Sequence, residues 1–312
     1  MPQAPGMNAA GDEARRQRRG TGLGMASGTC GELVQGAVED RNFMITFPID
    51  LYSKVEVTEV PLSPLEVWPP GKIKAKGAAA ELIAVLAARG SPACGVKITV
   101  ASPILEGKGF ASSSADVVAT CRAVADLLGA RVTDEDIGSI ACSIEPTDGV
   151  MVDHPVVFDF MRGRVLHDPG RRLPVIAVAV DPGGTVDTVG FRRLPYTSGE
   201  QDSLREIRDL AVAGLASGDI AAVGKAATVS ARINQRRLVT PHLAELERIC
   251  AAHGGVGVCV AHSGVIGAML FDERDAAASS AAAAEAESLL PGTVAFSLRS
   301  PNCADRAGGQ PQ

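Results

Sequence analysis

The sequence lacks the features that mark membrane, secreted and nucleic-acid-binding proteins. No apolar run in its 312 residues approaches the roughly 20 needed to cross a bilayer. Basic residues near the amino terminus are not followed by an apolar stretch, so no secretory signal is expected. The formal net charge is −6, and apart from one amino-terminal cluster the basic residues are scattered. We therefore expect a cytoplasmic protein with no membrane partner and no nucleic-acid partner.

Closely spaced cysteines and histidines are also missing. There is no C-x-x-C among the seven cysteines, and the five histidines include no H-E-x-x-H. A disulfide framework or a structural zinc site would show such spacings. The cysteines are odd in number and far apart, and we expect them to be reduced thiols that mostly fill the core. They are Cys30, Cys94, Cys121, Cys142, Cys250, Cys259 and Cys303.

What the sequence does contain is an alternation of strand and helix patterns, in an order that indicates an α+β fold with mixed sheets. The expected strands cover 32–38, 43–47, 51–59, 95–102, 150–158, 174–180, 256–260, 265–271 and 293–299. The expected helices cover 77–89, 112–128, 134–144, 200–217, 219–232, 241–253 and 273–289. No period of 20–50 residues recurs in the sequence, which excludes a solenoid.

Composition along the chain predicts two halves between two tails. Residues 1–25 are rich in Gly, Ala, Arg and Gln, which predicts a disordered amino-terminal arm, and the polar residues 301–312 predict a flexible tail. Glycine, proline and serine cluster near 183–200. This cluster divides the remainder into an expected amino-terminal domain, 26–185, and a carboxy-terminal domain, 186–300, around a shared cleft.

The most informative segment is the glycine- and serine-rich loop at residues 103–115, between an expected strand and an expected helix. Glycines let the backbone turn tightly and approach a ligand. Free N–H groups at a helix start attract anions, and serine hydroxyls can donate to phosphate oxygens or bind Mg²⁺. The segment therefore predicts a phosphate-binding loop. Its candidate nucleotide-binding residues are Pro103, Glu106, Gly107, Lys108, Gly109, Ala111, Ser112, Ser113 and Ser114.

Other phosphate-binding loops fit this segment less well. The Walker A pattern G-x-x-x-x-G-K-[ST] is absent, and serines replace the third glycine of a dinucleotide fingerprint. A flexible connector with a serine cap is the plain alternative. That alternative does not explain a strand directly before the loop, a helix directly after it, and a lysine between two glycines.

Three motifs in this order resemble those of the GHMP kinases, the family of galactokinase, homoserine kinase and mevalonate kinase. The segment at 103–115 resembles the second motif, Gly28–Gly36 (GTCGELVQG) resembles the first, and Val260–Gly267 (VAHSGVIG) resembles the glycine-rich third. The resemblance covers residues 26 to about 299 and implies a two-lobed α+β fold and an ATP-dependent kinase. The first two motifs and the segment Ser143–Asp148 (SIEPTD) most resemble L-threonine kinases, which make O-phospho-L-threonine for the cobalamin linker.

The resemblance also implies the cofactors ATP and Mg²⁺. Ser113 and Glu145, at the end of the expected helix 134–144, are the candidates that hold Mg²⁺, although an exposed glutamate is the alternative for the second. Lys108 is the candidate that neutralises the transferred charge, or else a solvated loop lysine. Asp148 is the candidate catalytic base, and it fits equally well as a turn former.

The remaining candidate residues concern the phosphoryl acceptor. Glu32, in the first motif, either contacts the acceptor or is a salt-bridged or exposed strand residue. Asp50 either reaches an acceptor ammonium group or forms a turn at a strand start. Ser263 and Gly264, in the third motif, are expected to support the nucleotide loop or the acceptor.

Together these observations favour a kinase that phosphorylates the hydroxyl of a small amino alcohol. The best acceptor is L-threonine, and homoserine or another small alcohol is the closest alternative. A member that binds nucleotide or metabolite without transfer is a separate class, which the presence of Ser113, Glu145 and Lys108 argues against. Decarboxylation or isomerisation on the same fold ranks lower. Whether the chain forms a homodimer is left open.

Overall fold

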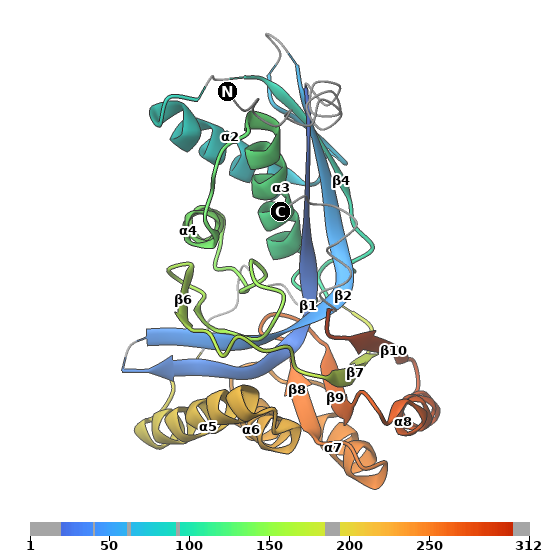
Figure 1. Cartoon of the computed structure of the whole chain (residues 1–312). Coiled ribbons are helices and arrows are strands. Elements are labelled where there is room, and N and C mark those ends of the chain that lie inside the picture. Colours follow the sequence, from blue (N-terminus) through green and yellow to red (C-terminus); the bar gives the residue numbers. More distant parts are fainter. Residues whose placement is uncertain (1–19, 40, 61–63, 92–93, 185–193, 302–312) are drawn as a thin grey trace, which may run out of the picture.

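The computed structural model describes residues 20–39, 41–60, 64–91, 94–184 and 194–301 (Figure 1). The strands are β1 (Thr21–Val38), β2 (Arg41–Glu59), β3 (Glu66–Trp68), β4 (Val96–Ala101), β5 (Val157–Asp159), β6 (Arg164–His167), β7 (Val175–Asp181), β8 (Gly257–Val260), β9 (Gly267–Asp272) and β10 (Val294–Arg299). The helices are α2 (Ile73–Ala88), α3 (Ser112–Leu128), α4 (Asp134–Ile144), α5 (Ser198–Ser217), α6 (Ile220–Asn234), α7 (Leu243–Ala252) and α8 (Ala276–Leu289). The expected α+β class is confirmed.

The strands join into one ten-stranded mixed sheet. Its main path has the order β10-β7-β9-β8-β1-β2-β4-β3, and the small strand β5 pairs with β2 and with β6. Most neighbours are antiparallel, while β3 and β4 are parallel. The path therefore connects strands from both ends of the chain through β1, which lies at its middle.

β1 and β2 form a long antiparallel hairpin that runs through both halves of the molecule (Figure 1). The upper part of the hairpin lies beside α3 and the lower part beside α5 and α6. Its register shifts three times between Ser27 and Val34, and such irregularities bend a strand. Glu32 lies within this stretch and pairs with Val260 of β8. The bend thus brings the first and third motifs together.

Helix α3 packs unusually close to β1. A Cβ atom built on Gly24 would lie 2.1 Å from the carbonyl oxygen of Ala119, so only glycine fits at that position. Helix α3 also contacts β2, α2 and α4. The close contact fixes the position of the loop that leads into α3.

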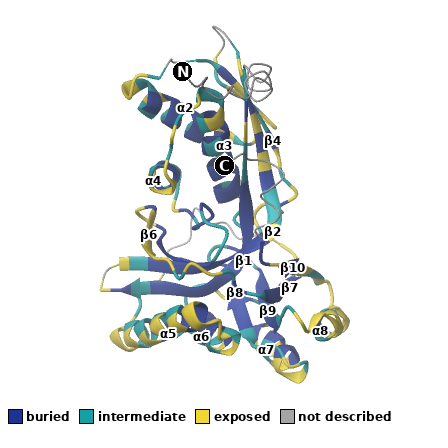
Figure 2. Ribbon diagram, viewed as in Figure 1, coloured by how far each residue is buried: buried dark blue, intermediate teal, exposed yellow. Residues whose placement is uncertain are grey.

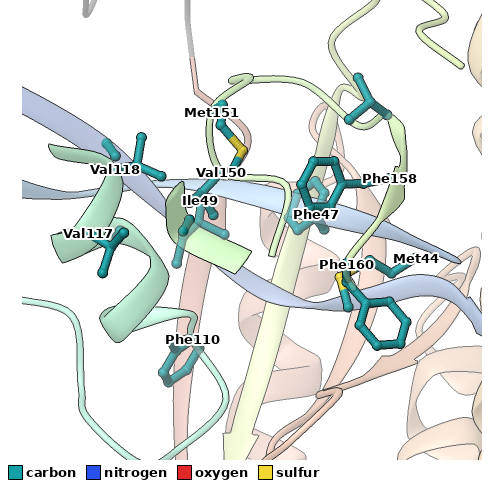
Figure 3. Close-up of a cluster of buried hydrophobic side chains, with 14 of the residues drawn as sticks. Met44, Phe47, Ile49, Phe110, Val117, Val118, Val150, Met151, Phe158 and Phe160 are labelled. Atoms are coloured by element: carbon teal, nitrogen blue, oxygen red, sulfur yellow. The ribbon is translucent and has the colours of Figure 1, made fainter. Parts of the chain in front are cut away.

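A hydrophobic cluster packs α3 and the loop before it against the hairpin and the chain around β5 (Figure 3), and buried residues line the sheet in both halves of the molecule (Figure 2). It contains side chains from the hairpin, from the loop before α3, from α3 itself and from the chain around β5, and large aromatic side chains there are fully buried. The labelled members are Met44, Phe47, Ile49, Phe110, Val117, Val118, Val150, Met151, Phe158 and Phe160. Because cores pack tightly, the backbone segments that carry the candidate site are held at fixed positions.

The structure corrects several sequence-based boundaries. Residues 21–25, assigned to a disordered arm, form the start of β1 and pair with β2, because backbone hydrogen bonding there does not need an alternating side-chain pattern. The strand expected at 150–158 is reduced to β5, since the chain turns after Asp148, where the N–H of Val150 bonds back to the Asp148 carbonyl. The rest of the arm, residues 1–19, and the tail at 302–312 lie outside the described residues.

The division of the chain at 185/186 stays a prediction. Strand β7, which precedes this point, pairs with β9 and β10, which follow it.

The six cysteines among the described residues are free thiols. Within the same residues, no helix combines the length and the apolar character needed to span a bilayer.

Candidate active site

The loop between β4 and α3 places the start of α3 where a ligand can reach it. Gly107 and Gly109 have φ values of 70° and 100°, and Ala111, the residue before the helix, has a φ of 56°. No side chain of the described residues caps the first turn of α3, and no acidic residue lies in that turn. The first N–H groups of the helix thus lack a side-chain cap among the described residues, and an anion could bind them.

Ser112 supports a polar ligand at this position. Its hydroxyl oxygen is buried and has no hydrogen-bond partner among the described residues. Buried polar atoms are normally paired, because leaving one unpaired costs about 1–3 kcal/mol. A phosphate oxygen next to the first turn of α3 would satisfy this hydroxyl.

The three sequence motifs meet at this loop. The N–H of Thr29, in the first motif, donates to the carbonyl oxygen of Phe110 at 3.1 Å. A Cβ on Gly264, in the third motif, would lie 2.3 Å from the carbonyl oxygen of Lys108, and a Cβ on Gly109 would lie 2.4 Å from the Cβ of Ala261. Gly264 therefore packs directly against the loop, which fits the expected supporting role of the third motif.

Ser113 and Glu145 are brought together although 32 residues separate them. The Ser113 hydroxyl donates to Glu145 Oε1 at 2.5 Å. Glu145 is the residue that ends α4, and its second oxygen, Oε2, is paired with the ammonium of Lys74. A carboxylate at a helix carboxyl end lies in unfavourable negative potential, which a nearby cation offsets.

Asp148 lies beside the same turn of α3. Its carboxylate accepts a hydrogen bond from the Ser114 hydroxyl at 3.0 Å. Burial raises the pKa of Asp148, the negative charge of Glu145 raises it further, and hydrogen bonds from Ser114 and Glu32 partly oppose this rise. The carboxyl groups of Asp148 and Glu32 are therefore neighbours in the site.

Glu32 is buried, with 2% of its surface exposed, and lies opposite Thr46 in the hairpin. The alternative of an exposed strand residue is therefore wrong for Glu32. The hydroxyl oxygens of Thr46 and of Thr147, the residue before Asp148, are buried without a hydrogen-bond partner in the described structure. Two carboxyl groups and two hydroxyl groups thus gather next to the loop.

Other expected site residues have different neighbours. The ammonium of Lys108 bonds to Asp181 Oδ2 at 2.9 Å and to the Gly184 carbonyl oxygen at 2.8 Å. Asp50 accepts from the Arg299 N–H at 3.2 Å and, with Pro103, lines an open hollow of about 410 Å³. Its recorded contacts among the described residues do not include Glu32 or Asp148. Roles for Lys108 and Asp50 in the reaction stay predictions.

The remaining two loop and motif residues are accounted for more simply. Glu106 forms an ion pair of 2.5 Å with Lys72. Ser263 is half-buried in the turn between β8 and β9. The neighbouring His262 bonds through Nδ1 to Gln35 Oε1 at 2.6 Å and packs edge-on against Phe160.

Sequence reasoning missed the basic residues at the start of α2. Lys72, Lys74 and Lys76 occupy the residue before the helix and its first turn, which contains no acidic residue. Cations are unfavourable at a helix amino terminus, so this clustering was a readable sign of nearby anions. Three of these anions are visible, since Lys72 binds Asp116 and Glu106, and Lys74 binds Glu145. Asp116, which also accepts from the Ser53 hydroxyl, was missed as well.

Comparison with known proteins decides the family. Residues 74–158 match the GHMP kinases N terminal domain, and residues 211–287 match the GHMP kinases C terminal domain. The chain is 30% identical to the L-threonine kinase of Salmonella typhimurium over 79% of this chain and 81% of the relative. The chain belongs to the GHMP kinases. It is 29% identical to the L-threonine kinase of Citrobacter freundii, over 79% of this chain and 85% of the relative.

Solved structures of the family share the fold. Homoserine kinase from Cytophaga hutchinsonii superposes with a TM-score of 0.71 at 14% identity, over 90% of this chain and 95% of that one. The two-lobed GHMP kinase fold expected from the sequence is therefore confirmed. As a member of this family, the protein is an ATP-dependent kinase that acts on a small alcohol.

Proposed function

We propose that the protein phosphorylates the hydroxyl group of L-threonine with ATP and Mg²⁺, giving O-phospho-L-threonine for the cobalamin linker, in the cytoplasm. The observation that carries this proposal is the meeting of Ser113, Glu145 and Asp148 at the first turn of α3. The acceptor follows from the L-threonine kinases of Salmonella typhimurium and Citrobacter freundii, to which the chain is similar over most of its length.

The phosphates of ATP would bind to the loop and to the start of α3. The free N–H groups there, the helix dipole and the unpaired Ser112 hydroxyl all favour an anion. In this proposal Gly107 and Gly109 allow the backbone to approach the phosphates. Lys108 holds the loop against the end of β7 through Asp181.

Ser113 and Glu145 fit a magnesium site. They provide a hydroxyl and a carboxylate oxygen, which are the donors that Mg²⁺ prefers. Among the described residues, no group of three or more histidine, cysteine, aspartate or glutamate side chains could hold a metal ion by itself. Mg²⁺ in kinases is commonly held by one or two protein groups together with substrate phosphates. When bound, the ion supplies positive charge that offsets the negative charge of the phosphates.

In this proposal Asp148 receives the proton of the acceptor hydroxyl. In the transfer, the acceptor oxygen forms a bond to the γ-phosphorus, while the bond from that phosphorus to the β–γ bridging oxygen breaks and ADP leaves with the electron pair. The hydroxyl proton passes to the Asp148 carboxylate. The Asp148 side chain bonds to Ser114 and Glu32, which favours the catalytic role over that of a turn former.

Negative charge around the acceptor suits an amino alcohol. The carboxyl groups of the buried Glu32 and of Asp148 are neighbours, and the nearby hydroxyl groups of Thr46 and Thr147 offer further hydrogen bonds. An acceptor ammonium group would be attracted to such a pair, whereas a neutral sugar would gain nothing from its charge.

The proposal is tested by measuring ADP release with ATP and Mg²⁺ in the presence of L-threonine, L-serine, L-homoserine, mevalonate or galactose. We expect L-threonine to give the highest kcat/KM, with phosphothreonine identified by mass spectrometry. A higher kcat/KM for another alcohol would overturn the acceptor, and L-homoserine is the first to compare. ATP binding without ADP release for any acceptor would contradict the kinase assignment.

A further inference from the structure

The start of α2 carries three lysines, two of which contact residues of the candidate site. Lys72 precedes the helix, and Lys74 and Lys76 lie in its first turn, where the helix dipole disfavours cations. No side chain caps this helix start, and no acidic residue of the turn itself offsets the charge. The anions that stabilise the lysines must therefore come from elsewhere in the fold or from a ligand.

The structure already assigns Lys72 to the fold. Its ammonium is ion-paired with Asp116 at 2.6 Å and with Glu106 at 2.5 Å, and only 15% of its side chain is exposed. Lys72 thereby ties α2 to α3 and to the nucleotide loop. Because two carboxylates already neutralise the Lys72 ammonium, this group would attract a substrate phosphate only weakly.

Lys74 is in a different position. Its side chain is 46% exposed, and its one polar partner in the described part of the chain is the Glu145 carboxylate. The Ser113 hydroxyl binds Oε1 of Glu145, while Lys74 binds Oε2. The ammonium of Lys74 therefore pairs with the second oxygen of the carboxylate that, with Ser113, is the proposed magnesium ligand.

The two other lysines near the loop are less suited to contact the transferred group. Lys108 is 19% exposed and is already held by Asp181 and by a backbone carbonyl. Lys72 is held by two carboxylates. Lys74 alone of the three is bonded to a residue of the proposed metal site, and any cation bound at Glu145 would weaken that bond by competing for the same carboxylate.

We propose that Lys74 is a catalytic residue whose ammonium contacts the γ-phosphoryl oxygens of ATP. Without nucleotide, the Lys74 ammonium is ion-paired with the Glu145 carboxylate. When Mg²⁺ and ATP bind, this ammonium moves to the γ-phosphate. This inference rests on the proposed function. During the transfer, the acceptor oxygen bonds to the γ-phosphorus, the bond to the bridging oxygen breaks with its electron pair leaving on ADP, and Asp148 takes the proton. Lys74 stays protonated throughout and stabilises the charge on the equatorial oxygens.

The test compares Lys74→Met, Lys74→Arg and the matched control Lys76→Met, an exposed lysine on the same helix. For Lys74→Met we expect kcat to fall about 10²-fold while the KM for ATP changes less than about threefold, because the contact is made mainly in the transition state. Lys74→Arg keeps the charge and should recover about tenfold of this loss. Lys76→Met should match the unaltered enzyme in both constants.

A second measurement does not depend on turnover. Binding of Mn²⁺ alone, followed by the electron paramagnetic resonance signal of the free ion, should be about threefold or more tighter in Lys74→Met, because the competing ammonium is gone. Weaker Mn²⁺ binding in this variant would mean that Lys74 only holds Glu145 in place, and would overturn the proposal. A kcat within about threefold of the unaltered enzyme would overturn it as well.

The same experiment separates this inference from the proposed function. If the unaltered enzyme releases ADP with none of the alcohols, the proposed function fails. The Mn²⁺ measurement then tests by itself whether the Lys74 ammonium lies beside the metal site. An unchanged Mn²⁺ affinity in Lys74→Met would then reject the placement of Lys74 beside the metal site. Thermal unfolding of each variant shows whether the fold is retained. We expect the Lys74 variants to keep the fold, because the Lys74 side chain is exposed.

Discussion

Helices α3 and α5 both begin near hydroxyl side chains, yet they use these side chains differently. At α5 the Thr197 hydroxyl accepts from the N–H of Glu200 at 3.3 Å, and the Glu200 carboxylate accepts from the N–H of Thr197 at 2.7 Å. This capping box satisfies the helix start from within the chain. At α3 no side chain caps the helix, and Ser113 and Ser114 donate to Glu145 and Asp148 instead.

The difference separates a structural helix start from one that is prepared for a ligand. Glu200 also binds Arg236, which holds the pKa of that carboxyl at about 2, so the capping residues of α5 are already paired. At the start of α3, the first N–H groups have no side-chain cap and the Ser112 hydroxyl has no hydrogen-bond partner among the described residues. Substitutions at α3 should therefore change activity more than stability, and substitutions at α5 should do the opposite.

The largest effect is expected for Ser113→Ala and Glu145→Gln. Each removes one of the two protein ligands proposed for Mg²⁺, so kcat should fall by about 10²–10³-fold, the range found when a single charge-stabilising group is lost. The fold should persist, because neither side chain belongs to the hydrophobic core. Steady-state kinetics at saturating ATP measures the effect, with circular dichroism as the control. Near-normal turnover in both variants would refute the metal assignment.

A smaller effect is expected for Asp148 and its hydrogen-bond donor Ser114. As a base Asp148 must be ionised, so kcat/KM should rise with pH through its pKa, which lies above the ordinary value of 3.8. The Ser114 hydrogen bond stabilises the ionised form, and Ser114→Ala should therefore move this rise to higher pH. Asp148→Asn should lower kcat by about 10²-fold and remove the rise.

The pH profiles of these variants and the unaltered enzyme, measured with one acceptor, check this prediction. A profile for Ser114→Ala that moves to lower pH, or does not move, would contradict the assignment of Asp148 as the base. Unchanged activity in Asp148→Asn would return Asp148 to a role in the turn.

The sequence predicted well what depends on neighbours in the chain. The strand, glycine-rich loop and helix at 95–128 have local patterns, and the structure reproduces them within one or two residues. The start of β1 was missed because residues 21–31 show no alternation of apolar and polar side chains, and their strand depends on pairing with β2. Lys74 was missed because its partner Glu145 is 71 residues away, a contact that no local pattern encodes.

The smallest effect on activity is expected for Thr197→Ala at the start of α5. Loss of the cap should lower the free energy of unfolding by about 1 kcal/mol, the usual cost of removing a threonine cap. Because α5 packs mainly against α6 and β1 among the described elements, kcat should stay within about threefold of its original value. Urea unfolding and steady-state kinetics measure the two quantities. A large loss of kcat with unchanged stability would break the contrast between α3 and α5, since it would show that the capping box of α5 takes part in catalysis.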